Sequence, residues 1–286
     1  MGAEQPATIR TRRLATELRR LREIAGLTGD QAARSLGWNP SKLSRYETAT
    51  RRVQPKDLQA LLDLYALPED RRQDLVDLAK NARFKGWWDA YGDTFPTELA
   101  TYIALEAEAA AIRGFSAQIV PGMLQTDEYA RSVIRSGLMD LAPRGETERR
   151  VEARKTRQRL LRREVGPLDY SVIMSEAALR NRIGSSEDMR AQCRHLMDLA
   201  QLPNVTVQII PFTSGAHPAM AGTFSILSFP ARYDEDVVYI ETMTSNLWVE
   251  DENDVHRYTL VLDHLRTIAY GIDESLSFLA TMADQL

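Results

Sequence analysis

The sequence has few of the features that stabilise small secreted proteins or that span membranes. It contains one cysteine among 286 residues, which excludes a disulfide framework and a metal site built from several cysteines. It has no run of about 18 apolar residues, so no transmembrane helix is expected. The first residues, MGAEQPATIRTRR, lack the apolar core of a signal peptide. These absences predict a protein of the reducing cytoplasm, without membrane contact.

The short motifs of common enzyme classes are also missing. There is no phosphate-binding P-loop, no glycine-rich dinucleotide turn and no HExxH. The histidines are scattered, and Cys193 is expected to be a small buried apolar residue rather than a nucleophile. We therefore expect no enzymatic activity, no cofactor and no bound metal. An enzyme hidden in the second half remains an alternative that would need converging carboxylates in a pocket, with Glu106, Glu176 and Glu241 as candidates.

The net charge of −4 hides a strong asymmetry between the two ends of the chain. Residues 1–56 contain 12 Lys and Arg against 5 Asp and Glu, a net charge of +7. Residues 165–286 contain 7 against 17, a net charge of −10. The distribution predicts a basic end that binds phosphate and an acidic end with another task.

Residues 27–52 contain the most informative pattern, which predicts two short helices joined by a tight turn. Thr28 and Gln31 have the spacing of a capping box at a helix start. Gly37 tolerates the left-handed conformation that ends a helix. Asn39 and Pro40 then suit the N-cap and first position of the next helix.

The second of these helices has the composition of a helix that enters the major groove of DNA. Leu43 and Tyr46 form a thin apolar stripe, and polar and basic residues occupy the outer face. We expect Glu47 to be structural. The predicted base-contacting residues are Ser41, Lys42 and Arg45. The predicted phosphate contacts are Thr28, Asn39, Ser44, Arg51 and Arg52. A small helical hairpin inside a bundle is the alternative without DNA.

The segment resembles the helix-turn-helix of lambda-repressor-like (Xre-type) regulators. These share a paired Ala, a Leu-Gly turn and a Ser-Arg-aromatic/aliphatic-Glu core, here Ser44-Arg45-Tyr46-Glu47. The resemblance implies binding to double-stranded DNA. Two positions depart from the family pattern. Gly29 stands where Gln is common, which removes a side-chain phosphate contact. Ala49 replaces the usual Gly after the Ser-Arg-x-Glu core.

Periodicity along the chain predicts two domains. Residues 1–83 are expected to form a mainly α, five-helix domain with the helix-turn-helix as its second and third helices. Residues 84–97, rich in aromatics and Gly, form the predicted linker. Residues 98–286 are expected to form an α+β domain with a small, mostly antiparallel sheet. Its predicted strands, where the period changes to two, are residues 168–174, 204–210, 223–229 and 237–242.

The segment 144–164 is expected to be an arginine-rich helix, with nine Lys and Arg against four Glu. Arg154, Arg157 and Gln158 share roughly one face of it. They form a candidate site for an acidic partner or an anionic ligand. A solvated helix held by pairs such as Glu146–Arg150 is the equally weighted alternative.

Residues 98–286 resemble the uncharacterised domain that follows an Xre-type helix-turn-helix in many actinobacterial regulators. The most specific block is Pro121-Gly122-Met123-Leu124-Gln125-Thr126. The resemblance implies a transcriptional regulator, often antitoxin-like, whose gene neighbours one for a very small acidic protein.

Together these features predict a cytoplasmic, sequence-specific DNA-binding regulator that forms a homodimer. Its second domain would sense a partner protein or a small ligand. The alternative function is a protein–protein adaptor that uses the helix-turn-helix domain for docking.

Overall fold

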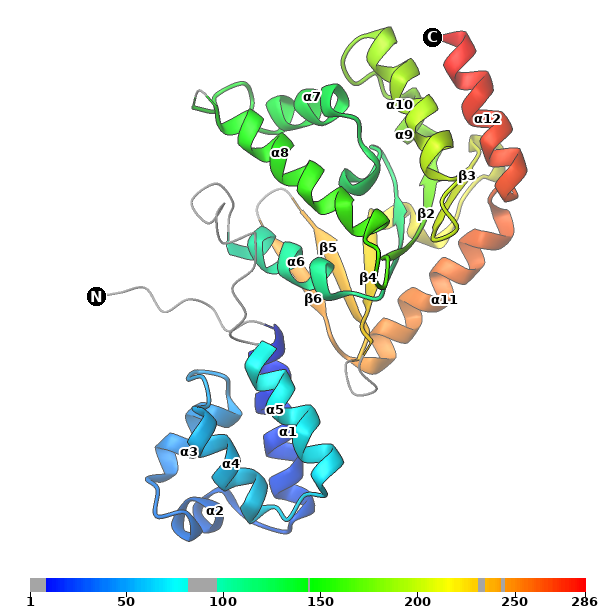
Figure 1. Cartoon of the computed structure of the whole chain (residues 1–286). Coiled ribbons are helices and arrows are strands. Elements are labelled where there is room, and N and C mark those ends of the chain that lie inside the picture. Colours follow the sequence, from blue (N-terminus) through cyan, green and yellow to red (C-terminus); the bar gives the residue numbers. More distant parts are fainter. Residues whose placement is uncertain (1–8, 82–96, 144, 231–234, 243–244) are drawn as a thin grey trace. The chain divides into compact units, whose positions relative to one another are not determined.

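The computed structural model describes residues 9–81, 97–143, 145–230, 235–242 and 245–286 (Figure 1). The chain divides into two compact units, residues 1–86 and residues 87–286. The predicted linker, residues 84–97, lies outside the described ranges except for Thr97. No helix of the described residues is long and apolar enough to cross a membrane.

The N-terminal unit is helical, as predicted. Its helices are α1 (Ile9–Ile24), α2 (Gly29–Ser35), α3 (Pro40–Glu47), α4 (Pro55–Leu64) and α5 (Glu69–Asn81). The predicted count of five helices is not confirmed for the whole domain, because both ends of the unit lie outside the described ranges. Its core includes Leu18, Leu43, Tyr46, Leu61 and Leu62, which come from α1, α3 and α4.

The C-terminal unit alternates helices with strands. It begins with α6 (Thr97–Glu108), β1 (Ala111–Ser116), a 3-10 turn (Gly122–Leu124), α7 (Asp127–Gly137), α8 (Glu146–Gln158) and a second 3-10 turn (Arg159–Arg162). It continues with β2 (Asp169–Ser175), α9 (Ala177–Arg180), α10 (Ser186–Leu199) and β3 (Val205–Ile210). It ends with β4 (Phe224–Ser228), β5 (Val237–Glu241), β6 (Asn246–Val249), α11 (Glu252–Ile268) and α12 (Ile272–Gln285).

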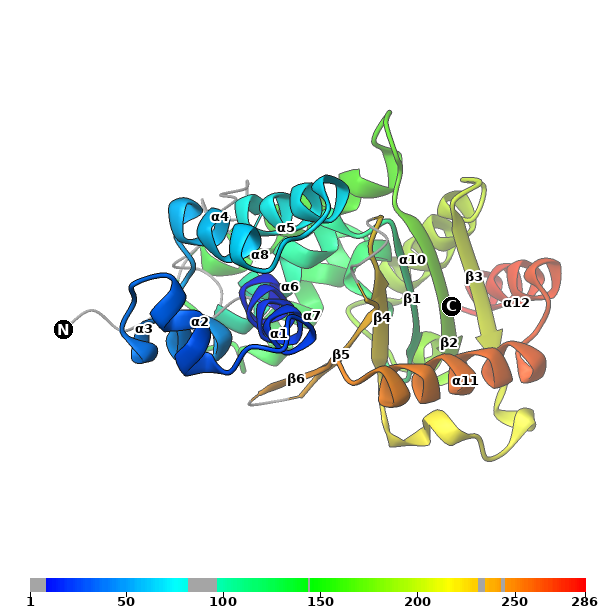
Figure 2. The same ribbon diagram turned by 90° about the horizontal axis from the view of Figure 1, so that it is seen from below.

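The prediction of a mostly antiparallel sheet is wrong. The six strands of the described residues form one mixed sheet in the order β3-β2-β1-β4-β5-β6 (Figure 2). β1 pairs with β2 and β2 with β3 in parallel, whereas β4, β5 and β6 are antiparallel to their neighbours. The parallel pairs follow from long helical crossovers, α7–α8 between β1 and β2 and α10 between β2 and β3.

Helices pack on both faces of the sheet. On one face Phe115, Ile226 and Val238 pack against α11 residues that include Leu262 and Leu265. Adjacent residues of a strand point to opposite faces, so Tyr239 points away from this layer. Its ring stacks on Tyr102 of α6, with 4.3 Å between the ring centroids. Helix α6, which leads the chain out of the predicted linker, therefore packs on the face opposite α11.

Candidate DNA-binding interface

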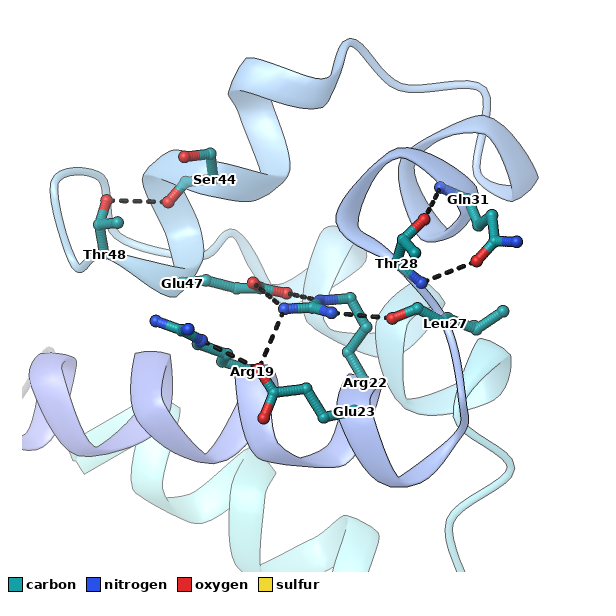
Figure 3. A network of polar contacts seen from close by, with 9 residues as sticks. All are labelled: Arg19, Arg22, Glu23, Leu27, Thr28, Gln31, Ser44, Glu47 and Thr48. Atoms are coloured by element: carbon teal, nitrogen blue, oxygen red, sulfur yellow. Dashed lines mark hydrogen bonds and ion pairs between the residues drawn. The ribbon is translucent and has the colours of Figure 1, made fainter.

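Helix α2 begins with the predicted capping box, which the structure confirms (Figure 3). The Gln31 amide donates to Thr28 Oγ1 at 3.2 Å, and the Thr28 amide donates to Gln31 Oε1 at 2.8 Å. These bonds satisfy two of the amides that a helix start leaves without an intrahelical partner. The phosphate contact predicted for Thr28 therefore depends on the remaining amides of the first turn.

The turn between α2 and α3 is fixed by backbone hydrogen bonds. Gly37 has a φ of 66°, which a residue with a side chain rarely adopts. The amide of Trp38 donates to the carbonyl of Ala33 at 2.8 Å. Asn39 then caps α3, because its Oδ1 accepts from the Ser41 amide at 2.9 Å and from the Ser41 hydroxyl at 2.8 Å. The turn and the cap together fix the direction of α3.

Helix α3 has one buried face and one exposed face. Leu43 and Tyr46 are each 1% exposed and anchor the helix in the core. Ser41, Ser44 and Arg45 are exposed on the outer face. Arg45 Nε donates to the Ser41 carbonyl at 3.1 Å, and no other side-chain hydrogen bond of Arg45 occurs among the described residues. The terminal guanidinium nitrogens of Arg45 are thus available for a ligand.

Lys42, also predicted to contact bases, lies in a different environment. Its Nζ forms an ion pair with Asp57 of α4 at 2.8 Å and lies 3.9 Å from the ring centroid of Trp38. The side chain is half-buried. A base contact by Lys42 therefore requires that it leave this ion pair.

Asp57 is a residue that the sequence analysis missed. It links α4 to α3, because it accepts from Lys42 and, at 2.6 Å, from the hydroxyl of Tyr46. Burial tends to raise the pKa of Asp57, but the hydrogen bonds from Lys42 and Tyr46 outweigh burial and lower that pKa. Burial, followed by the hydrogen bond to Asp57, raises the pKa of Tyr46 to about 12. Tyr46 therefore stays a neutral donor to a charged carboxylate at neutral pH.

A second link, which the sequence analysis also missed, joins α1 to the end of α3 (Figure 3). Arg22 donates to the two carboxylate oxygens of Glu47 at 2.8 and 3.0 Å and to the carbonyl of Leu27 at 2.8 Å. The two side chains of the ion pair are only 11% and 9% exposed. Glu47 is structural, as expected, because its carboxylate is occupied inside the domain.

The loop after α3 exposes the other two predicted phosphate ligands, Arg51 and Arg52. Their position follows from the way the helix ends. Thr48 Oγ1 donates to the Ser44 carbonyl at 2.8 Å, and the Arg51 amide donates to the Arg45 carbonyl at 2.9 Å. Ala49 has a φ of 56°. The chain therefore makes this exit turn with a residue that is less suited to it than Gly.

The candidate ligand residues of the C-terminal unit converge on the Pro121–Thr126 block. Arg157 binds Glu106, with distances of 2.6 and 2.7 Å to the two carboxylate oxygens. Gln158 donates to the carbonyls of Gly122 and Gln125 at 3.0 and 2.8 Å. Arg154 donates to Oε1 of Gln125. All three predicted ligand residues thus have internal partners, and those of Arg154 and Gln158 lie in the block itself.

Two candidate pocket carboxylates are also occupied. Glu106 is fully buried against Arg157. Glu176 pairs with Arg180 at 2.5 Å and accepts from the amide of Phe212 at 2.8 Å. Glu241 is exposed at the end of β5. Cys193 is buried, as expected, and burial raises the pKa of its thiol to about 11.

Comparison with known proteins gives two family matches. Residues 13–75 match a family described as a helix-turn-helix domain, which includes α2, α3 and the basic loop. Residues 99–281 match a family described as a domain of unknown function, DUF5753. No curated protein matches the chain, and no solved structure does. Because the second match spans more than half of the sequence, the chain belongs to the DUF5753 family and has a helix-turn-helix domain in front of that domain.

Proposed function

We propose that the protein is a sequence-specific regulator of the Xre type that binds double-stranded DNA in the cytoplasm. The observation that carries this proposal is the two-sided α3. Leu43 and Tyr46 fix it in the core, and Ser41, Ser44 and Arg45 are free to face a groove. The helix-turn-helix family match supports the same function.

The proposed contacts divide into two classes. Arg45 and Ser41 contact base edges, and Arg45 has the free nitrogens that a bidentate guanine contact requires. Lys42 joins them only if DNA displaces it from Asp57. The phosphate class comprises Thr28, through the amides of its helix start, and Asn39, Ser44, Arg51 and Arg52.

The base-contact class is tested with Arg45→Ala. Loss of a bidentate contact costs about 1–3 kcal/mol at one base pair, so the variant should lose its preference between cognate and scrambled DNA. Arg19→Ala removes the same charge from an exposed position of α1, outside α2 and α3, and serves as the matched control. Mobility shifts measure both variants, and circular dichroism checks their helical content. If Arg45→Ala still discriminates as well as the control, Arg45 does not contact bases.

The phosphate class is tested by salt dependence. Arg51→Ala with Arg52→Ala should weaken binding to all DNA sequences alike and reduce the slope of log K against log salt by about one to two units. Binding with no salt dependence would favour the alternative, in which the helix-turn-helix domain docks on a protein.

We further propose that residues 98–286 form a homodimer and receive the regulatory signal, in the manner of an antitoxin-like regulator. The charge division supports this, since the proposed phosphate contacts lie within the basic residues 1–56, whereas residues 165–286 have a net charge of −10. The signal would be a small acidic protein encoded nearby or a small anionic ligand. The protein would then change DNA affinity only if that signal distinguishes two arrangements of the dimer.

A further inference from the structure

Three arginines of α8 lie at helical spacing on one side of the helix, but their charges are neutralised to different extents. Arg150, Arg154 and Arg157 are four and three residues apart, which places them along one face. Arg157 is fully paired with the buried Glu106. Burial alone would lower the pKa of Arg157, but attraction to Glu106 outweighs burial and raises that pKa.

Arg154 has no such partner. Its guanidinium carries five N–H donors, and the hydrogen bond that the described residues give it goes to the neutral amide oxygen of Gln125. Burial, followed by the positive charge of Arg157, lowers the pKa of Arg154, and Glu241 acts in the opposite direction without forming an ion pair. An arginine remains charged at neutral pH even so. Arg154 is therefore a half-buried cation without a paired anion in the described part of the chain.

Arg150, one turn earlier, is also incompletely satisfied. Its Nη2 donates to Glu146 at 2.6 Å, but its Nε is buried and has no partner among the described residues. Other arginines of this domain do reach carboxylates, as the pairs Arg113–Asp236, Arg131–Glu148 and Arg180–Glu176 illustrate. Others, such as Arg163 and Arg190, donate to backbone carbonyls. What distinguishes α8 is that two incompletely satisfied arginines lie one turn apart on one face.

Removing a charge from water without an opposite charge is costly, so buried cations in folded proteins are normally paired. Gly122 lies beside this position, because a Cβ atom there would be 3.8 Å from Arg154 Nε and 3.7 Å from Arg157 Nη1. At Gly122, therefore, no side chain stands against these two guanidinium groups. Both features fit a position that an anion from outside the domain occupies.

We propose that Arg154 and Arg150 bind the carboxylate group of a ligand. Only about one positive charge is uncompensated, which suits a carboxylate better than a phosphate with nearly two negative charges. The planar guanidinium fork of Arg154 can donate two parallel hydrogen bonds to a carboxylate. The inference rests on the regulatory part of the proposed function, since it specifies where the signal binds. Its test measures binding without DNA.

The test is thermal unfolding of the full chain in sodium acetate against sodium chloride at equal ionic strength. Acetate is a small carboxylate, so its binding does not depend on the shape of the rest of a ligand. At about tenfold above its Kd, acetate should raise the Tm of the wild type by about 3–6 °C relative to chloride. The shift should disappear in Arg154→Met and shrink in Arg150→Gln. It should persist in Arg149→Met, an exposed arginine on the same helix.

Arg154→Met has a second readout, which separates a binding residue from a structural one. Without acetate this variant should be at least as stable as the wild type, because it removes a poorly paired charge and keeps side-chain volume. If Arg154→Met does not fold, Arg154→Lys replaces it, since Lys keeps the charge but loses the fork, and a reduced acetate shift is expected. An acetate shift that is absent from the wild type, or equal in wild type and the Arg154 variants, overturns the proposal.

The same assay separates two sources of the carboxylate. An acetylated and amidated Ala-Glu-Ala tripeptide has one side-chain carboxylate as its only charge. A larger shift with the tripeptide than with acetate indicates an acidic protein segment, and an equal or smaller shift indicates a small organic acid. Failure of DNA binding would leave these shifts unaffected, so the two proposals fail independently.

Discussion

Ala49 adopts a backbone conformation that its side chain disfavours. Its φ of 56° lies in the left-handed region, where a residue with a Cβ atom costs about 1–2 kcal/mol. The turn that positions Arg51 and Arg52 therefore lowers the stability of the protein.

Replacing Ala49 with Gly should consequently stabilise the N-terminal unit. We expect a gain of about 0.5–1 kcal/mol, because Gly relieves the strain but adds freedom to the unfolded chain. Thermal unfolding measures it. Ala60→Gly, inside α4, is the matched control and should destabilise by about 1 kcal/mol. Equal losses from the two variants would contradict a strained Ala49.

Asp57 makes a contribution to stability that depends on pH. Its pKa is lower in the folded state, so its contribution to stability is complete above the unfolded pKa of about 3.9 and is lost as pH falls through the folded pKa. The difference in unfolding free energy between the wild type and Asp57→Asn should therefore be largest at neutral pH and shrink in acid. Urea unfolding between about pH 6 and pH 2 measures this difference. A difference that stays constant down to the lowest pH would show that the Asp57 carboxylate contributes no charge interaction.

At the scale of elements, local signals were predicted well and long-range pairing was not. The capping box at Thr28, the cap at Asn39 and the stop at Gly37 depend on neighbouring residues, and the sequence alone identified them. The four predicted strands occur within about two residues of their expected ends. β1 was missed, because Ala111–Ser116 follows an Ala-rich helix and contains a Gly and an Arg. β6 was missed because it has only four residues.

The partners of the charged residues inside the two units were equally unrecognisable in the sequence. Arg22 and Glu47 are 25 residues apart, and Glu106 and Arg157 are 51 residues apart. Periodicity assigns a residue to a helix face but does not identify the residue across from it. The sequence therefore predicted Arg157 as a free ligand residue, whereas the fold gives it an internal carboxylate.

β1 contains Gly114, a residue type that makes a strand harder to recognise in a sequence. The reason for Gly here is the close approach of the neighbouring strand. A Cβ atom at Gly114 would lie 2.5 Å from the backbone carbonyl oxygen of Phe224 in β4. Gly114→Ala must therefore push two central strands apart, and we expect it to destabilise the C-terminal unit by about 1–3 kcal/mol. Gly29→Ala, where a Cβ atom meets no atom within 4 Å, is the control and should leave stability nearly unchanged. Thermal unfolding compares the two, and equal effects would contradict the close approach of β1 and β4.

At the scale of the whole molecule, one helix-turn-helix contacts only a few base pairs. Useful affinity generally requires two half-sites about one helical turn apart. If residues 98–286 supply the dimer contact, the full chain should be a dimer by light scattering and the fragment 1–83 a monomer. A monomeric full chain at micromolar concentration would contradict this prediction.

The position of β1 has a consequence for the order in which the protein folds during synthesis. Both neighbours of β1 come much later in the chain, since Ala111 pairs with Asp169 on one side and with Ser228 on the other. The centre of the sheet thus cannot form until β4 has been synthesised. The N-terminal helices, by contrast, need only contacts within their own unit. We expect each nascent chain to expose a finished helix-turn-helix while residues 87–286 are still unfolded.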